Sequence, residues 1–255
     1  MLNNFYKRYR LLIETALMVI ALIGMKLLIE FLSLAFIEMT ALFTSVIAGG
    51  IFILSIILSG TLADYKESEK LPAEIASSVE SIYQEGLSIK HAKNGFNIEK
   101  LRENLDGILK SFKKDLGAQN SRGALIFIEN LSESFLEMEK LEVPPNFIVR
   151  LKQEQSIIRK SFLRVYHIQR TNFLPSAQIL TQSIVFLILL LLVFTKIEPV
   201  LNGIVMVAFV SYLFIYLLRL LRIIDTPFRV DEYTTDDVSL FLLRETSERI
   251  KPQAR

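Results

Sequence analysis

The residue types that carry catalysis in proteins are sparse in this sequence of 255 residues. It contains no cysteine, which removes thiolate nucleophiles, disulfides and cysteine metal ligands together. Its two histidines, His91 and His167, lie in ordinary amphipathic segments, and no HExxH, GxSxG, GxGxxG or Walker pattern occurs. We therefore expect a protein that is not an enzyme.

Acidic residues near the end of the chain are the candidates for holding a metal ion: Asp231, Glu232, Asp236 and Asp237. Carboxylates are the hard oxygen ligands that Ca²⁺ prefers, although the spacing is not that of an EF-hand loop. The pair Asp236-Asp237 also stands where it can cap a helix over Val238–Ile250. Helix capping and calcium binding are therefore both roles for this cluster.

A stripe of small and hydroxyl-bearing residues follows one helical face of an apolar segment, Met39–Leu62. It contains Thr44, Ala48, Ser55 and Ser59, with the larger Phe52 and Ile56 among them. Small residues let helices pack closely in a membrane. The same face can instead line a pore, with hydroxyls wetting the path and Phe52 or Ile56 forming an apolar constriction. Periodicity alone leaves both interpretations open.

The elements that must carry these residues are apolar segments of about 20 residues, the length that crosses a hydrocarbon core of roughly 30 Å. Four occur: Leu11–Leu28, Met39–Leu62, Phe173–Thr195 and Val200–Leu221. The chain is 51% hydrophobic and 22% charged, which is typical of apolar blocks in lipid and charged blocks in water.

Basic residues flank these segments mainly on one side, which by the positive-inside rule places both termini in the cytoplasm. The residues of that side are Lys7, Arg8, Arg10, Lys66, Lys70, Arg164, Arg170, Arg219, Arg222 and Arg229. The other side has only Lys26 and Lys196. Glu14 and Lys26, at the two ends of the first segment, are expected at the membrane interfaces.

Residues 66–172 are polar and show helical periodicity, with apolar residues every three or four positions. We expect a cytoplasmic helical bundle there, with helices capped by Asn97 and Asn146. The sequence thus predicts four parts: transmembrane helices one and two (1–65), a cytoplasmic helical domain (66–172), transmembrane helices three and four (173–224) and a cytoplasmic tail with a short helix (225–255).

Two short segments resemble bestrophins and bestrophin-like prokaryotic proteins. The pair Pro227-Phe228, directly after the fourth span, resembles the Pro-Phe-Gly-acidic segment of that superfamily, with Arg229 in the place of the glycine. The exit of the second span, Ala63–Glu74, resembles the charged stretch through which a pore helix leaves the membrane, its aromatic content reduced to Tyr65. The layout of two spans, a helical insert, two spans and a tail is also similar.

The resemblance implies an all-α membrane protein that assembles as a homopentamer around its second spans. It implies passive ion conduction, anions being the usual case, and a further constriction in the cytoplasmic part. On this sequence the pore-lining residues would be Thr44, Ala48, Phe52, Ile56 and Ser59, and the cytoplasmic mouth would hold Asp64, Tyr65 and Lys66. Calcium sensing would fall on Asp231, Glu232, Asp236 and Asp237.

We therefore expect an oligomeric ion channel of the inner or plasma membrane, with the bilayer, inorganic ions and further copies of the chain as partners. Calcium is the one cofactor that the acidic cluster suggests. A net charge of +2 argues against nucleic acid as a binding partner. One alternative is a non-conducting membrane scaffold whose helical domain binds a soluble partner. Another is a small transporter, which requires a polar site at mid-membrane that the sequence does not show. The charges at the mouth are mixed in sign, so counting them does not choose between anions and cations.

Overall fold

The computed structural model describes residues 2–118, 122–170, 175–229 and 236–251. The elements are α1 (Leu2–Phe31), β1 (Ile37–Glu38), α2 (Ala41–Ala92), α3 (Ile98–Ala118), α4 (Arg122–Lys140), α5 (Pro145–Arg170), α6 (Pro175–Phe194), β2 (Thr195–Lys196), α7 (Val200–Asp225) and α8 (Phe241–Arg249). They form two compact units. The described residues of the first unit fall within 1–65, 172–225 and 233–236, and those of the second within 66–171, 226–232 and 237–255.

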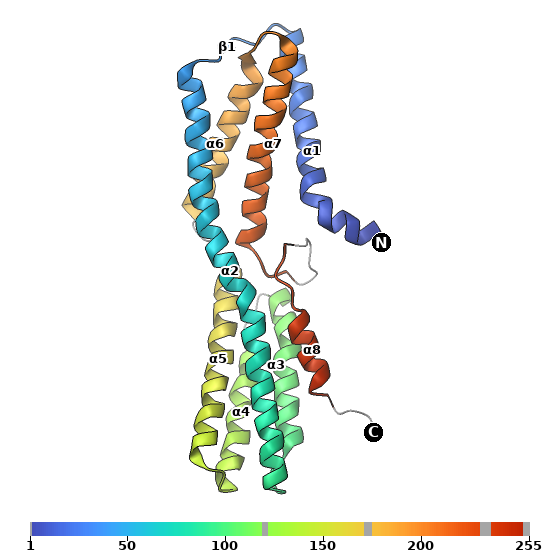
Figure 1. The fold of residues 1–255 in the computed structure, drawn as a ribbon, viewed down its shortest axis with the longest axis vertical. Helices are drawn as coiled ribbons and strands as arrows, with labels where there is room; N and C mark the ends of the chain where they lie inside the picture. Colours follow the sequence, from blue (N-terminus) through green and yellow to red (C-terminus); the bar gives the residue numbers. More distant parts are fainter. Residues whose placement is uncertain (1, 119–121, 171–174, 230–235, 252–255) are drawn as a thin grey trace. The chain divides into compact units, whose positions relative to one another are not determined.

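The first unit contains the four helices that are long and apolar enough to cross a membrane, among the residues that the structure describes. They are α1, the first part of α2, α6 and α7, so each of the four predicted apolar segments forms a long helix. In this unit α1 packs against both α6 and α7, and α6 packs against α7 (Figure 1). Helices satisfy every backbone polar group within the segment, which is what a hydrocarbon environment requires.

One face of α2 packs against α6 and α7. Phe43 and Leu54 of this face are buried in an apolar cluster with Val185, Ile188, Leu192, Val207 and Phe214. Gly50 makes the approach possible, because a Cβ atom there would lie 2.5 Å from Cδ1 of Ile188. Lipid tails are as apolar as leucine, so close packing rather than the hydrophobic effect must hold the helices together.

Lys26 of α1 contacts β2 within the first unit. Its side chain is buried, its amine donates to the backbone oxygen of Thr195, and it lies 2.6 Å from the Glu30 carboxylate. Thr195 belongs to β2, which pairs in parallel with β1 through Ile37 and Glu38. Lys26 is thus a buried partner of β2, a contact that its position in the sequence did not indicate, and its place at a membrane interface stays a prediction.

The second unit buries the apolar faces that the sequence predicted. In it α3 packs against α4 and α8, and α4 packs against α5. Fully buried side chains come from every one of these long helices and from the second part of α2, among them Ile75, Ile82, Leu105, Ile108, Ile128, Phe135, Ile158 and Phe162. A buried carboxylate, Asp115, links three helices by accepting from the Ala124 backbone N–H at 2.8 Å and from the Tyr166 hydroxyl at 2.9 Å.

Three local features differ from the prediction or sharpen it. The helix that begins as the second span continues without a break through Pro72 to Ala92. Asn97 caps α3 as predicted, its side-chain oxygen accepting from the Lys100 N–H at 3.1 Å. Asn146, however, lies inside α5, which begins at Pro145, a residue whose missing N–H suits the first turn.

The last helix also begins later than predicted. Residue Leu240 precedes α8 and provides no side-chain cap, so Asp236-Asp237 does not cap this helix. The side chain of Asp237 faces Arg229 instead, with Oδ1 3.5 Å from Nη1.

The packing of Gly50 predicts a contrast with its neighbour Gly49. A Gly50→Leu substitution should lower the free energy of unfolding by about 1–3 kcal/mol, because the new side chain must displace Ile188. A Cβ at Gly49 would meet nothing within 4 Å, so Gly49→Leu should be neutral or stabilising. Thermal unfolding of both variants in detergent measures the difference. Equal melting temperatures would contradict the packing described here.

Candidate functional site

The five residues predicted to line a pore all lie on the exposed face of α2 in the first unit. Thr44, Ala48 and Ser59 are exposed, and so are the two large residues, Phe52 (66%) and Ile56 (57%). At about 100° per residue these positions cover an arc of about 120°, opposite the buried face with Leu54. Within one chain, therefore, the small residues of the stripe do not serve helix packing, which falls to Gly50 on the other side.

Hydroxyl groups on this face bond back to the helix that carries them. Thr44 Oγ1 donates to the Thr40 oxygen at 3.2 Å, and Ser55 Oγ donates to the Ile51 oxygen at 2.8 Å. With their protons engaged, these hydroxyls present oxygen lone pairs to whatever lies beside the helix. The stripe is therefore weakly polar without being charged.

The exposed faces of the other three apolar helices have a different composition. Large apolar side chains dominate there: Leu17, Ile20, Leu28, Ile179, Phe186, Leu187, Leu201, Val205 and Phe209. Such surfaces suit lipid. The stripe on α2 is the face on which small and hydroxyl-bearing residues outnumber large ones.

The stripe is long enough to accompany an ion across most of a bilayer. From Thr44 to Ser59 the helix rises about 22 Å at 1.5 Å per residue, out of roughly 30 Å of hydrocarbon. Phe52 and Ile56 lie about one turn apart near its middle. The stripe residues before Phe52 and after Ile56 are smaller. If several copies of the helix surrounded an axis, the side chains of Phe52 and Ile56 would therefore reach closest to that axis.

The predicted mouth residues differ in what they contact. Asp64 and Tyr65 are partly buried, whereas Lys66 is exposed. The Tyr65 hydroxyl donates to the backbone oxygen of Asp236 at 2.8 Å, so its ring is held by the tail. Sequence reasoning placed Tyr65 at the mouth but gave no sign of this contact.

Beyond the apolar part of α2, Glu67 is tied to α5 within the second unit. Arg164 donates to both of its carboxylate oxygens, at 3.0 and 2.8 Å. This fork geometry is the strong form of the arginine–carboxylate bond. The bond to Arg164 lowers the pKa of Glu67, so the carboxylate stays ionised and its charge is balanced locally.

Of the predicted calcium ligands, Asp231 and Glu232 lie outside the described residues. Asp237 is buried and faces the Arg229 guanidinium, and Asp236 accepts from Tyr65 through its backbone. The described residues contain no group of three or more His, Cys, Asp or Glu side chains that could hold a metal ion. A cation of the chain thus already faces Asp237, which does not fit a metal ligand. Calcium binding by the full set of four stays a prediction.

An ion cluster in the first unit was not foreseen. Glu14 of α1 pairs with Arg219 of α7 and lies 2.8 Å from the Arg10 guanidinium. An ionic group at membrane depth is tolerated when it is paired. Only the packing of α1 on α7 reveals this cluster, and no spacing in the sequence indicates that packing.

Comparison with solved structures finds similar proteins, whereas comparison with known sequences does not. No protein-family profile and no curated protein matches this sequence significantly. Two crystal structures of a bacterial bestrophin homologue from Klebsiella pneumoniae, each carrying one mutation, are similar to the chain. In the first, the TM-score is 0.74 at 16% identity, covering 96% of this chain and 97% of that one. In the second, it is 0.73 at 15% identity, covering 95% and 96%.

A further crystal structure, of a membrane protein, has a TM-score of 0.74 at 16% identity and covers 95% of this chain and 96% of that chain. The likeness extends over nearly the whole length of both chains, including the polar helices, and so concerns the fold as a whole. The chain is therefore a membrane-embedded helical protein with a bestrophin-like fold.

Proposed function

We propose that the chain is a divergent member of the bestrophin superfamily and forms an oligomeric ion channel whose pore is lined by α2. The observation that carries this proposal is the exposure of all six stripe residues while the opposite face of α2 is packed. A face of small and hydroxyl-bearing residues is suited to a wet path, and a bestrophin-like fold supports the same function.

A pore of this kind needs several copies of the chain, because a single α2 cannot enclose an axis. We propose a homopentamer, the assembly that the resemblance to bestrophins implies. Closed cyclic symmetry would bring identical stripes together around one axis. Exposed apolar residues of the second unit would then be available for contacts between copies, among them Ile126, Leu136, Val149, Ile157 and Leu163.

The constriction of the proposed pore would be a ring of Phe52 with a ring of Ile56 one turn away. Both side chains are large, apolar and more than half exposed in the single chain. A narrow apolar ring excludes water and so raises the barrier to an ion, which still carries its hydration shell. The flanking Ala48 and Ser59 would leave wider and more polar regions on each side.

We propose anions as the favoured ions because of the charges beyond the apolar part of α2. Within the second unit, Lys66 and Lys70 lie four residues apart on one face of α2, and both are exposed. Glu67 and Glu69 are turned away from that face by about 80°. The charge of Glu67 is also balanced by Arg164. The mixed signs in the sequence thus separate into a basic stripe and acidic flanks.

The scaffold alternative predicts an exposed apolar patch on the helical domain and a stripe face of the second span that is fully packed against other spans. In the first unit α2 is packed on one side only, and its other side has the composition least suited to lipid. We therefore favour the channel. We also propose that both termini and the second unit lie in the cytoplasm, in an inner or plasma membrane, as the basic flanks indicate.

The proposed constriction predicts a gain of function on truncation. In liposomes that contain the purified protein, Phe52→Ala and Ile56→Ala should each raise ion flux. A barrier lowered by ~1 kcal/mol corresponds to about a fivefold increase. Phe209→Ala is the matched control, because Phe209 is equally exposed (66%) but lies on α7.

Flux that is absent from the wild type and from all three variants, at either sign of membrane potential, would favour the scaffold instead. An equal rise in Phe209→Ala would show that the effect is not specific to α2.

The basic stripe predicts selectivity. A Lys66→Glu/Lys70→Glu double variant should shift the reversal potential in a salt gradient toward that of the cation, since the charge facing the path changes sign. Lys160→Glu, an exposed lysine of α5, should leave it unchanged. An unaltered reversal potential in the double variant would separate these lysines from the conduction path.

A further inference from the structure

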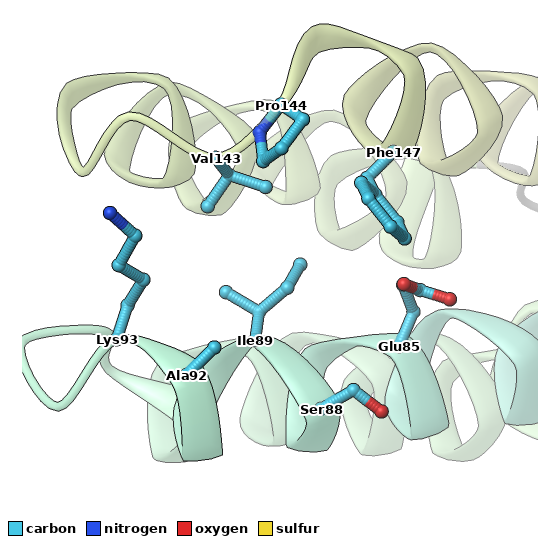
Figure 2. Close-up of a pocket in the computed structure, with 8 residues that line it drawn as sticks. All are labelled: Glu85, Ser88, Ile89, Ala92, Lys93, Val143, Pro144 and Phe147. Atoms are coloured by element: carbon cyan, nitrogen blue, oxygen red, sulfur yellow. The ribbon is translucent and has the colours of Figure 1, made fainter.

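The second unit contains a cavity of about 150 Å³ between the end of α2 and the turn that joins α4 to α5. Figure 2 shows its two walls facing each other. One wall is the last turns of α2 with Lys93, and the other is Val143, Pro144 and Phe147. The cavity belongs to the second unit and the stripe to the first, and the proposed conduction function gives the cavity no role.

The lining is apolar over most of its area. Ile89 and Ala92 face Val143, Pro144 and Phe147 across the space (Figure 2). Ser88, at the edge, already donates its hydroxyl proton to the Gln84 backbone oxygen at 3.1 Å. A concave apolar wall with few polar groups is the usual form of a small-molecule site. A cavity of 150 Å³ holds a body the size of benzene.

The two ends of the cavity carry opposite charges, but only one of these is balanced. At one end Glu85 forms an ion pair with Arg150, whose guanidinium also lies 5.8 Å from the centre of the Phe147 ring. At the other end stands Lys93, and the described residues place no carboxylate within ion-pair distance of its amine. The next lysine, Lys90, donates to the Asn94 backbone oxygen at 2.7 Å. Lys93 is thus the cation that remains to recognise an anion.

The frame around the cavity is fixed without a ligand. Val143 N–H donates to the Met138 oxygen at 3.1 Å, closing the turn after α4. Pro144 and Pro145 then restrict the backbone that leads into α5. On the opposite side, the Phe96 N–H donates to the Lys93 oxygen at 3.1 Å, and the Phe96 side chain is fully buried. Pre-organised walls reduce the cost of binding.

We propose that this cavity binds a small monocarboxylate whose apolar body of about six carbon atoms fills the space between Ile89 and Phe147. Its carboxylate would pair with Lys93. Residues 85 to 93 span about 12 Å of helix, enough for such a chain to lie along α2. A cation is disfavoured at the Lys93 end, and a neutral molecule cannot form the ion pair with that amine that a carboxylate forms. The charge and the volume together therefore define the ligand class.

Binding of hexanoate to the full-length protein in nanodiscs, measured by calorimetry against empty nanodiscs, tests this proposal. We expect saturable binding with a Kd on the order of 1 mM or tighter, from burial of the chain and the ion pair. Hexan-1-ol, which has the same number of carbon atoms as hexanoate but lacks the charge, should bind about tenfold more weakly.

Matched variants locate the site. Lys93→Met keeps the length of the side chain but removes its charge and should weaken hexanoate binding about tenfold or more. Lys90→Met should leave the affinity unchanged, because that amine serves a backbone oxygen. Ala92→Leu should abolish binding by filling the cavity.

Equal binding of hexan-1-ol and hexanoate, or full affinity in Lys93→Met, would overturn the proposal. Absence of saturable binding to the wild type would overturn it as well. If the wild type bound no hexanoate and Ala92→Leu changed the mass of the oligomeric particle, we would conclude that a side chain from a second copy of the chain fills the cavity. None of these readouts depends on conduction.

Discussion

The rotation of α2 about its own axis is the constraint on which the account of this protein depends. Gly50 brings α2 against Ile188 of α6, and Leu54 completes the same buried face. Because these contacts fix one side of the helix, the side with Phe52 and Ser59 must face outward. In lipid no hydrophobic effect draws helices together, so a contact of this closeness is what holds the orientation. A one-residue change in register would turn the stripe by about 100°.

Charged side chains form ion pairs inside both units. In the first unit Lys26 and Glu14 are paired within the apolar helices, where an unpaired charge would be costly. In the second unit Glu67 is bound to Arg164 and Asp237 faces Arg229, so two acidic side chains are balanced within the fold. Lys66 and Lys70 are exposed and Lys93 is partly buried beside the cavity, and we propose that these lysines interact with anions.

Sequence patterns predicted those parts of the structure that depend on local periodicity. The four apolar segments, the buried faces of the polar helices and the cap at Asn97 follow from spacing alone. Periodicity left the stripe open between helix packing and pore lining, and its exposure was established only by the burial of Leu54 on the other face. The pairing of Glu14 with Arg219, the burial of Lys26 and the contact between Asp237 and Arg229 could not be predicted. They depend on which helices and loops meet, and helical periodicity does not determine that.

The most direct test of the central claim is whether the stripe faces water inside a bilayer. Because the chain has no cysteine, a single Ser59→Cys substitution places one thiol on the stripe, and Leu187→Cys places one on the exposed face of α6. A charged, membrane-impermeant thiol reagent should modify Ser59→Cys rapidly and reduce ion flux, and should leave Leu187→Cys unmodified. Equal protection of both thiols in liposomes that contain the folded protein would contradict a pore lined by α2.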